Sequence, residues 1–427
     1  MGFCFIATYS ATVLVAQSAV AVDHSDRLKE LLSTASLTTA VDEFGTVVQK
    51  NPDDHQAKVA LGLVQFMQAV EQLAQQNYKF GLFDRTFRGI PGAQMPVPIN
   101  ETPTEIRYED YRSMIKSFRI GISRAESTLA AVDTSQELKL KFYIGQAMLD
   151  IDGDNKVTQE ESLGVLFAGM NRRGERLDLK KDPDVIDKFY VGVDGADVHW
   201  LRGYCNLLMA MDDIVLAYDE QDLFERCAHL FYPKISTPYA FLDKESSQPG
   251  IWDARRFADI IAFIHSVDFE LIDADRMRSA HAQLLEMLHQ SRQCWKLALA
   301  EQDDDQEWIP NPKQAGVIRL RVNQQQVNGW AGVIDEAEAI LQGEKLIPFW
   351  RKYSTTLFNA PQFPEQGTGI NLKSVFYEPR DFDLVLFLTG TDSAPYLEDG
   401  PLSTPETWSR LERAFDGQFF FFALWLN

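Results

Sequence analysis

The 427-residue sequence predicts a mainly helical protein that ends in a small α+β segment. Apolar residues recur at spacings of three and four over several long stretches, which is the pattern of amphipathic helices packed on a core. Near the C-terminal end the pattern changes to short, continuous apolar runs, which are typical of buried strands. Hydrophobic residues make up 45% of the chain and charged residues 24%, so the apolar surface suffices for more than one domain.

The chain begins with the outline of a signal peptide. Its first 22 residues carry no charged side chain, and residues 3–16 are largely apolar before the small-residue stretch Ala19-Val20-Ala21. We expect residues 1–21 to be removed, the mature chain to begin at or near Val22, and the protein to be exported to the periplasm or secreted. The usual basic residues are missing, which leaves a misplaced start codon or a retained membrane anchor as the alternatives. We expect no membrane span after leader removal, since no later stretch is long and apolar enough.

Residues 22–80 are expected to form a helical hairpin. Apolar ladders over 37–49 and 59–73 predict two helices, and Pro52 between them fits the first turn of the second helix. The junction resembles the boundary between two tetratricopeptide repeats, at Ala40, Phe44, Asn51, Pro52, Ala57, Leu61, Gly62 and Phe66. A solenoid needs about three repeats for a continuous core, so a generic helical hairpin is the alternative.

The rest of the chain divides by composition. Residues 81–104 are rich in Gly and Pro and are expected to be a linker or a long loop. Residues 105–345 are expected to form a helical domain, with helices over 111–132, 197–218, 253–264, 274–301 and 326–341. Residues 346–427 are expected to form the α+β region, with strands over 382–388 and 419–426 and, between them, a helix capped at 403–406. Apolar runs of this length fit a buried helix as well.

Residues 150–161 have the carboxylate spacing of an EF-hand loop. Acids stand at its first, third, fifth and twelfth positions, which are Asp150, Asp152, Asp154 and Glu161. Calcium takes six to eight oxygen ligands at about 2.3–2.6 Å, and this spacing lets the first three carboxylates converge while the last closes the shell with both oxygens. The resemblance to EF-hand proteins implies that these four side chains bind Ca2+.

The other loop positions follow the same resemblance with one departure. Lys156, at position seven, would contribute its backbone carbonyl, and Thr158, at position nine, would bind directly or through a water. We expect Val157 to anchor the loop in the core. Asn155 replaces the usual glycine at position six, where the backbone needs a positive φ that Asn tolerates better than most residues.

The segments that flank the loop leave its supports open. Residues 138–149 fit either an entering helix or a strand, and residues 163–167 fit an exiting helix. EF-hands commonly work in pairs, but the nearest second candidate, residues 194–197, lacks the spacing. A lone site in an exported protein favours a permanently filled structural brace, for which a dissociation constant of about 10⁻⁴ to 10⁻³ M suffices.

A second group of acids lies in residues 301–307. It consists of Glu301, Asp303, Asp304, Asp305 and Glu307. We expect a solvated acidic loop, with a second cation site or a pair of catalytic acids as the alternatives. Acids that follow a helix C-terminus oppose its dipole, which draws attention to these five.

Charge and motif content exclude several classes of function. The formal net charge of −21, from 62 acidic and 41 basic residues, repels nucleic acid. No HExxH, GxSxG or phosphate-binding GxxxxGK motif occurs in the sequence.

Aromatic side chains at helical spacing favour core packing over a ligand groove. Three cysteines follow the leader and are expected to be buried hydrophobes, with at most one disulfide among Cys205, Cys227 and Cys294.

With residues 349–351 (Phe-Trp-Arg), the hairpin and the loop make the chain resemble uncharacterised exported bacterial proteins that contain an EF-hand, a resemblance that implies no activity. We therefore expect a non-enzymatic, calcium-binding protein, with calcium in a structural role. It would act as a binding or assembly module whose helical surface meets a protein partner. The alternative is a metal-assisted hydrolase that uses the 301–307 cluster.

Overall fold

The computed structural model describes residues 22–34, 36–82, 98–158, 161–164, 189–243, 254–317, 321–353 and 363–426. The expected leader, 1–21, lies outside these residues, as does most of the expected linker, 83–97. Within the described parts, none of the helices combines the length and the apolar character needed to cross a bilayer.

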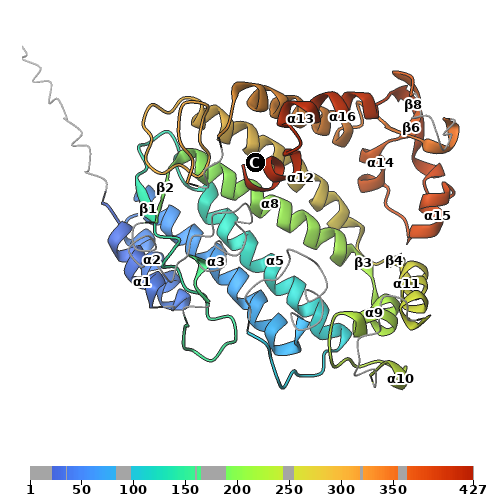
Figure 1. Cartoon of the computed structure of the whole chain (residues 1–427), viewed down its shortest axis with the longest axis horizontal. Coiled ribbons are helices and arrows are strands. Elements are labelled where there is room, and N and C mark those ends of the chain that lie inside the picture. The colour runs from blue at the N-terminus through green and yellow to red at the C-terminus, as the bar shows by residue number, and fades with distance from the viewer. Residues whose placement is uncertain are drawn as a thin grey trace, which may run out of the picture.

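Helices that follow one another along the chain pack side by side, so the long helices form a continuous array (Figure 1). α2 packs on α3, α3 on α5, α5 on α8, and α8 on α12, while α13 lies over α12. The mainly helical prediction is confirmed. The members of the array are α1 (Ser25–Ser33), α2 (Leu37–Lys50), α3 (His55–Phe80), α5 (Tyr108–Ala130), α8 (Gly195–Ala217), α12 (Ala274–Ala298) and α13 (Gln324–Leu341).

The long helices begin and end near the residues that their apolar periodicity predicts. α3 starts where the Asp54 side chain accepts a hydrogen bond from the Ala57 N–H. Pro52 lies in the turn before this cap, so its predicted place in the first helical turn is wrong. Gly62 of α3 faces α5, and a Cβ there would lie 2.5 Å from the Leu129 side chain. Glycine at this position therefore allows the two helices to approach closely.

A buried ion network holds the middle of the array together. Asp213 of α8 accepts hydrogen bonds from Arg119 of α5, at 2.8 Å to each carboxylate oxygen, and from Arg276 of α12 at 2.6 Å. Ser279 and Gln283 of α12 donate to the same carboxylate. Burial alone raises the pKa of Asp213, but these hydrogen bonds outweigh it and hold the pKa below its usual value.

One hydrophobic core contains residues from the expected hairpin, the expected helical domain and the C-terminal region, from Leu28 to Leu426. Cys205, Cys227 and Cys294 are all buried and free, as expected for small hydrophobes. The remaining helices of the middle region lie at the end of the array that carries the N-terminus of α5 and the last turn of α8. They are α9 (Gln221–Cys227), α10 (Ala240–Asp243) and α11 (Ala254–Ser266).

Short strands tie neighbouring loops together in small antiparallel sheets. β1 (Leu140–Phe142) pairs with β2 (Val191–Val193), with Lys141 opposite Gly192. In a second sheet β4 (Asp268–Leu271) lies between β3 (Tyr218–Asp219) and β7 (Phe382–Asp383). In a third, β6 (Gln366–Ile370) lies between β5 (Ile347–Pro348) and β8 (Leu397–Pro401).

Both strands predicted for the C-terminal region are wrong for most of their length. Residues 382–388 form only the two-residue β7 before the chain enters α15 (Leu384–Thr389), and 419–425 form α17 (Phe419–Trp425). The Asp383 side chain caps α15 by accepting from the Leu386 N–H, and Gly390 ends it with a φ of 96°. The helix predicted after 403–406 is α16 (Pro405–Glu412). A further helix, α14 (Leu372–Tyr377), comes before α15 along the chain.

α17 has a buried face that includes Phe422 and an exposed face that includes Phe420. Phe422 stacks on Trp295, with 5.5 Å between ring centroids, and also contacts Trp330. Phe420, on the other face, is 84% exposed. A spacing of three and four therefore separates buried from exposed residues inside a run that has no polar residue to reveal it.

Candidate calcium site

The 150–161 loop is closed at its base by strand-like pairing. Met148 and Ser162 form an antiparallel bridge, and the Leu149 N–H donates to the Glu161 carbonyl at 3.1 Å. Met148 N–H also donates to the carbonyl of Leu32 at 3.1 Å, which fastens the loop to α1. Of the two readings of the entering segment, the structure takes the strand, β1 and the bridge that follows it. The exiting segment is described only as far as residue 164.

The first three acids of the loop converge. Carboxylate oxygens of Asp150, Asp152 and Asp154 all lie within 4.8 Å of one another. Two ligands of one calcium ion, each at about 2.3–2.6 Å from it, are at most about 5 Å apart. The three side chains are therefore close enough together to share an ion, and they run from buried Asp150 to exposed Asp154.

Backbone N–H groups inside the loop hold these carboxylates in place. Asp150 accepts from Gly153 at 2.9 Å with one oxygen and from Asn155 at 3.2 Å with the other. Asp154 accepts from the Lys156 N–H at 2.7 Å, while the Lys156 side chain is exposed. Asn155 has a φ of 61°, so it adopts the conformation that position six requires.

Glu161 is 1% exposed and joins the two halves of the loop. One of its carboxylate oxygens accepts from the Ile151 N–H at 2.9 Å, and the other accepts from the N–H and the hydroxyl of Thr158 at 2.9 and 3.0 Å. It thus contacts positions two and nine and is not part of the group that the three aspartates form. The predicted core anchor is wrong in identity, because Ile151 is buried in the core whereas Val157 is half-buried.

One face of α3 forms a wall of the loop that the sequence did not reveal. The buried carboxylate of Glu71 accepts from the Asp150 N–H at 2.8 Å, and the Gln75 amide donates to the Asp150 carbonyl at 2.7 Å. One turn further, burial raises the pKa of Tyr78, and the charges of Asp152 and Asp154 add to the effect. The available signal is a polar residue at each of positions 71, 75 and 78, the same-face spacing of a helix.

The loop region carries an excess of negative charge. Burial raises the pKa of Glu71 to about 7, and the charges of Asp150 and Glu161 raise it further against the hydrogen bond from Asp150. Burial and neighbouring acids also raise the pKa of Asp152. Among the described residues, no ion pair links these carboxylates to Lys, Arg or His.

The second acidic stretch, 301–307, divides into outward and inward members. Asp303, Asp304 and Asp305 are exposed, as a solvated loop requires. Glu301 and Glu307 turn inward, and their carboxylates converge with Asp194 to within 4.8 Å. At that distance two unit charges repel by roughly 3 kcal/mol at an effective dielectric constant of about 20. Residues 194–197, set aside because of their spacing along the chain, thus take part in an acidic cluster through the fold.

The aromatic residues serve mainly as core. Trp295 and Trp330 are buried, whereas Trp252 lies outside the described residues. Trp200 and Tyr204 line a cavity of about 20 Å³. A cavity of that size holds about one water, so it does not serve as a substrate pocket.

No protein-family model, no curated protein and no solved structure matches this chain. What can be inferred about function therefore rests on the geometry of the loop and of the surfaces around it.

Proposed function

We propose that the protein binds one calcium ion in the 150–161 loop. Asp150, Asp152, Asp154 and Glu161 would supply side-chain oxygens, and Lys156 its backbone carbonyl. The observation that supports this most strongly is the approach of three loop carboxylates to within 4.8 Å without a cationic partner among the described residues.

Calcium fits this donor set better than other metals. Every candidate ligand is an oxygen, which is the preference of a hard cation, and no His or Cys belongs to the group. Magnesium demands a smaller octahedral shell and gives up its waters reluctantly, so a loop that offers up to seven oxygens suits it poorly.

The role that we propose for calcium is structural. The loop is fastened to α1 through Met148 and to α3 through Glu71 and Gln75, so an ion there would link elements at one end of the array. A bound cation would neutralise the acids and so remove the repulsion among their carboxylates that destabilises the folded state without the ion. Outside the cell, where we propose that the protein acts, calcium is plentiful enough for a weak site to stay filled.

A binding or assembly role is the broader part of the proposal. α11 leaves apolar side chains exposed along its length, and contiguous apolar surface of this kind is typical of sites that contact another molecule. The exposed residues are Phe257, Ile260, Ile261, Phe263 and Ile264.

The arrangement of the 301–307 acids gives little support to the alternative hypothesis, a metal-assisted hydrolase. Only Glu301 and Glu307 point inward, and among the described residues neither forms an ion pair with a basic side chain. We therefore favour binding over catalysis.

Isothermal titration of chelator-stripped protein with calcium tests the loop. We expect Asp152→Asn to weaken binding at the loop by about tenfold or more, equivalent to about 1.4 kcal/mol. Asp303→Asn, which removes an exposed acid from the other stretch, is the matched control and should bind like the wild type. Magnesium should compete poorly. Equal calcium affinity in the Asp152 variant and the wild type would contradict the proposal.

A further inference from the structure

Three carboxylates outside the EF-hand-like loop lie close together at the N-terminal end of α8. Asp194 caps the N-terminus of α8, Glu301 follows the end of α12, and Glu307 lies in the loop beyond it. Oxygens from all three lie within 4.8 Å of one another, as one ion of calcium's size requires of its ligands. Asp194 and Glu301 are half-buried, so the cluster is open to solvent on one side.

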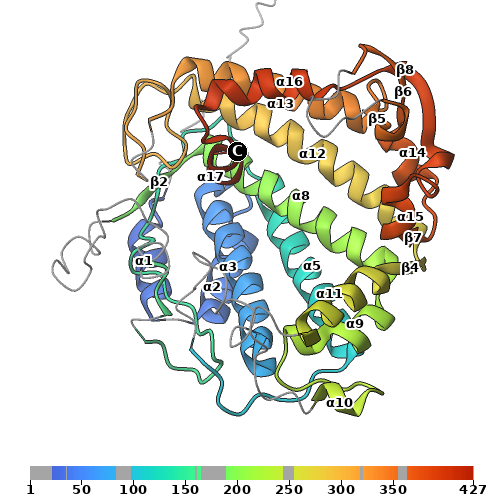
Figure 2. The ribbon, with the colours of Figure 1, turned by 45° about the vertical axis from the view of Figure 1, so that its right-hand side comes forward.

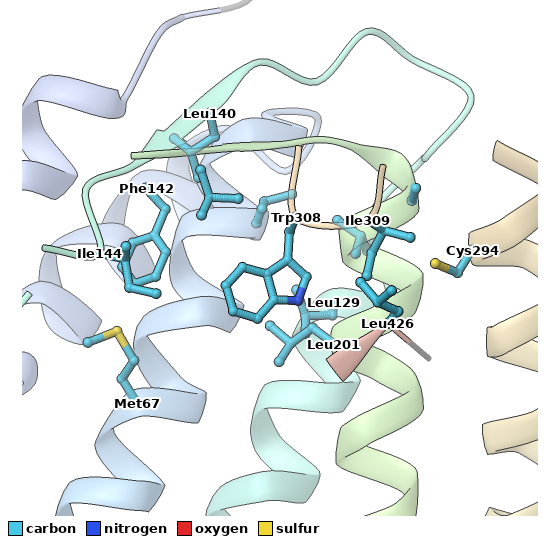
Figure 3. Packing of buried hydrophobic residues seen from close by; sticks show 14 of the residues in the cluster. Met67, Leu129, Leu140, Phe142, Ile144, Leu201, Cys294, Trp308, Ile309 and Leu426 are labelled. Atoms are coloured by element: carbon cyan, nitrogen blue, oxygen red, sulfur yellow. The ribbon is translucent and has the colours of Figure 1, made fainter. Parts of the chain in front are cut away.

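The backbone fixes this meeting point. β2 leads directly into Asp194, and the Gly192 N–H donates to the Gln306 carbonyl at 3.2 Å. A Cβ on Gly192 would lie 2.4 Å from the Asp305 carbonyl oxygen, so only glycine allows the two segments to lie this close. Trp308 follows Glu307 and extends into the core toward Leu129 and Leu201, which anchors the loop from below (Figure 3).

A fourth carboxylate adds an observation independent of the cluster. Asp197, one turn into α8, is only 7% exposed. One of its oxygens accepts from the Asp194 N–H at 3.1 Å, and the other, Oδ1, is buried without a hydrogen-bond partner. Its hydrogen bond with the Asp194 N–H places the Asp197 carboxylate directly beside the backbone of a member of the cluster. The buried Oε1 of Glu301 likewise lacks a donor.

Neutralising groups around the cluster are weak. Among the described residues, no Lys, Arg or His forms an ion pair with any of the four acids. Asp194 accepts from the Ala196 and Asp197 N–H groups, and the N-terminus of α8 contributes about half a positive charge. The end of α12 near Glu301 has the opposite sign. The other donors are neutral: the Gln314 amide to Glu301 and the Asp305 N–H to Glu307.

We propose that Asp194, Asp197, Glu301 and Glu307 form a second site for a hard divalent cation of calcium's class. The donors are all oxygens, which disfavours zinc or copper. Asp194, Glu301 and Glu307 bind directly, and Asp197 binds directly or through a water. The site does not depend on the 150–161 loop, so either site can fail a test while the other passes.

Calcium counting in a loop-disabled protein tests the second site. The full chain carrying Glu161→Gln, stripped with chelator, is dialysed against calcium, and bound metal is measured by mass spectrometry. We expect two ions per wild-type chain, one in Glu161→Gln, and none when Asp194→Asn and Glu307→Gln are added. Asn keeps the helix cap at position 194. Asp303→Asn, an exposed acid of the same loop, is the matched control and should keep the ion.

The melting temperature in chelator guards against a variant that merely fails to fold. Removing two acids from an uncompensated cluster should raise the melting temperature without calcium and abolish the calcium-dependent rise. If Glu161→Gln binds no calcium, or binds equally with and without Asp194 and Glu307, the second site is wrong and the carboxyls share a proton instead. If the wild type binds one ion that Glu161→Gln retains and the Asp194 and Glu307 changes remove, the second site stands and the loop proposal fails.

Discussion

The two ends of α8 bury acids in opposite ways. Near its last turn, Asp213 is enclosed by two arginines, a serine and a glutamine from the neighbouring helices. At its first turn, Asp194 and Asp197 meet Glu301 and Glu307, and no basic side chain of the described residues pairs with them. The two ends lie along the same helix, across the array from one another (Figure 2).

The contrast shows where this fold supplies its own counter-charge and where it does not. Arg119 and Arg276 reach Asp213 from α5 and α12, so the array can deliver cations to a buried acid. At the N-terminus of α8 and in the 150–161 loop, the acids gather without such partners among the residues that the structure describes. Uncompensated like charges are costly to hold together, and a bound cation is the simplest physical remedy.

The largest expected effect concerns the compensated end. Asp213→Ala leaves Arg119 without its carboxylate partner and Arg276 with only the more exposed Asp273. Removing one partner of a buried ion network costs about 3–5 kcal/mol. Urea unfolding should show this loss equally in calcium and in chelator. A loss that calcium reverses would mean that the two ends of α8 do not differ in the way described.

Gly192→Ala should have the next largest effect, at the uncompensated end. The added Cβ meets a backbone oxygen of Asp305 that cannot rotate away, and overpacking of this kind costs about 1–3 kcal/mol. Gly45→Ala is the matched control, because no atom lies within 4 Å of its Cβ and Ala favours a helix. Comparable urea midpoints for the two variants would show that the approach of β2 to the 305–307 segment is not tight.

Asp212, the neighbour of Asp213 along the chain, should make the free energy of unfolding depend on pH. Burial raises the pKa of Asp212 to about 7, and the charge of Asp213 adds to this against the attraction of Arg119. The folded state then binds more protons than the unfolded state between about pH 4 and 7, so the free energy of unfolding falls as pH rises through that window. Asp212→Asn cannot ionise, so its free energy of unfolding should not fall in this way. Above pH 7 the variant should therefore be more stable than the wild type, by at most about 1 kcal/mol because the group is partly exposed. A difference that is constant from pH 4 to 8 would contradict the shift.

The smallest effect is expected for the outward acids. Replacing Asp303, Asp304 and Asp305 together by Asn should change stability within about ±0.5 kcal/mol per site, because all three side chains are exposed. Asn keeps the oxygen that accepts from Tyr190 and from the Ala315 N–H. A large drop in melting temperature, or loss of a bound metal, would show that these acids belong to the inward cluster.

The sequence predicts the loop and misses the cluster for a physical reason. The first three loop acids lie within five residues, so local spacing is enough to bring Asp150, Asp152 and Asp154 together. Asp194 and Glu301 meet only because α8 and α12 pack against each other, and a single sequence does not show which helices pack. The wall on α3 is missed for the same reason.

The helix bounds follow from apolar periodicity, whereas the C-terminal strands do not. Residues 419–426 offer no polar position to mark a period, and their burial depends on contacts with distant rings such as Trp295 and Trp330. On either side of α15, the capping residues Asp383 and Gly390 carry a helical signal that the continuous apolar run over 382–388 obscures.

Thermal unfolding with calcium and with chelator, in the wild type and in Glu161→Gln, tests the calcium loop most directly. A ligand that binds only the folded state adds about 2.7 kcal/mol at 100 times its dissociation constant, so calcium at about 10 mM and a constant of about 0.1 mM give that gain. We predict that the wild type melts several degrees higher in calcium than in chelator, and that Glu161→Gln, which keeps the shape and loses the charge, lacks the part of this rise due to the loop. Equal rises in the two proteins, or none in either, would contradict a calcium ion in the loop.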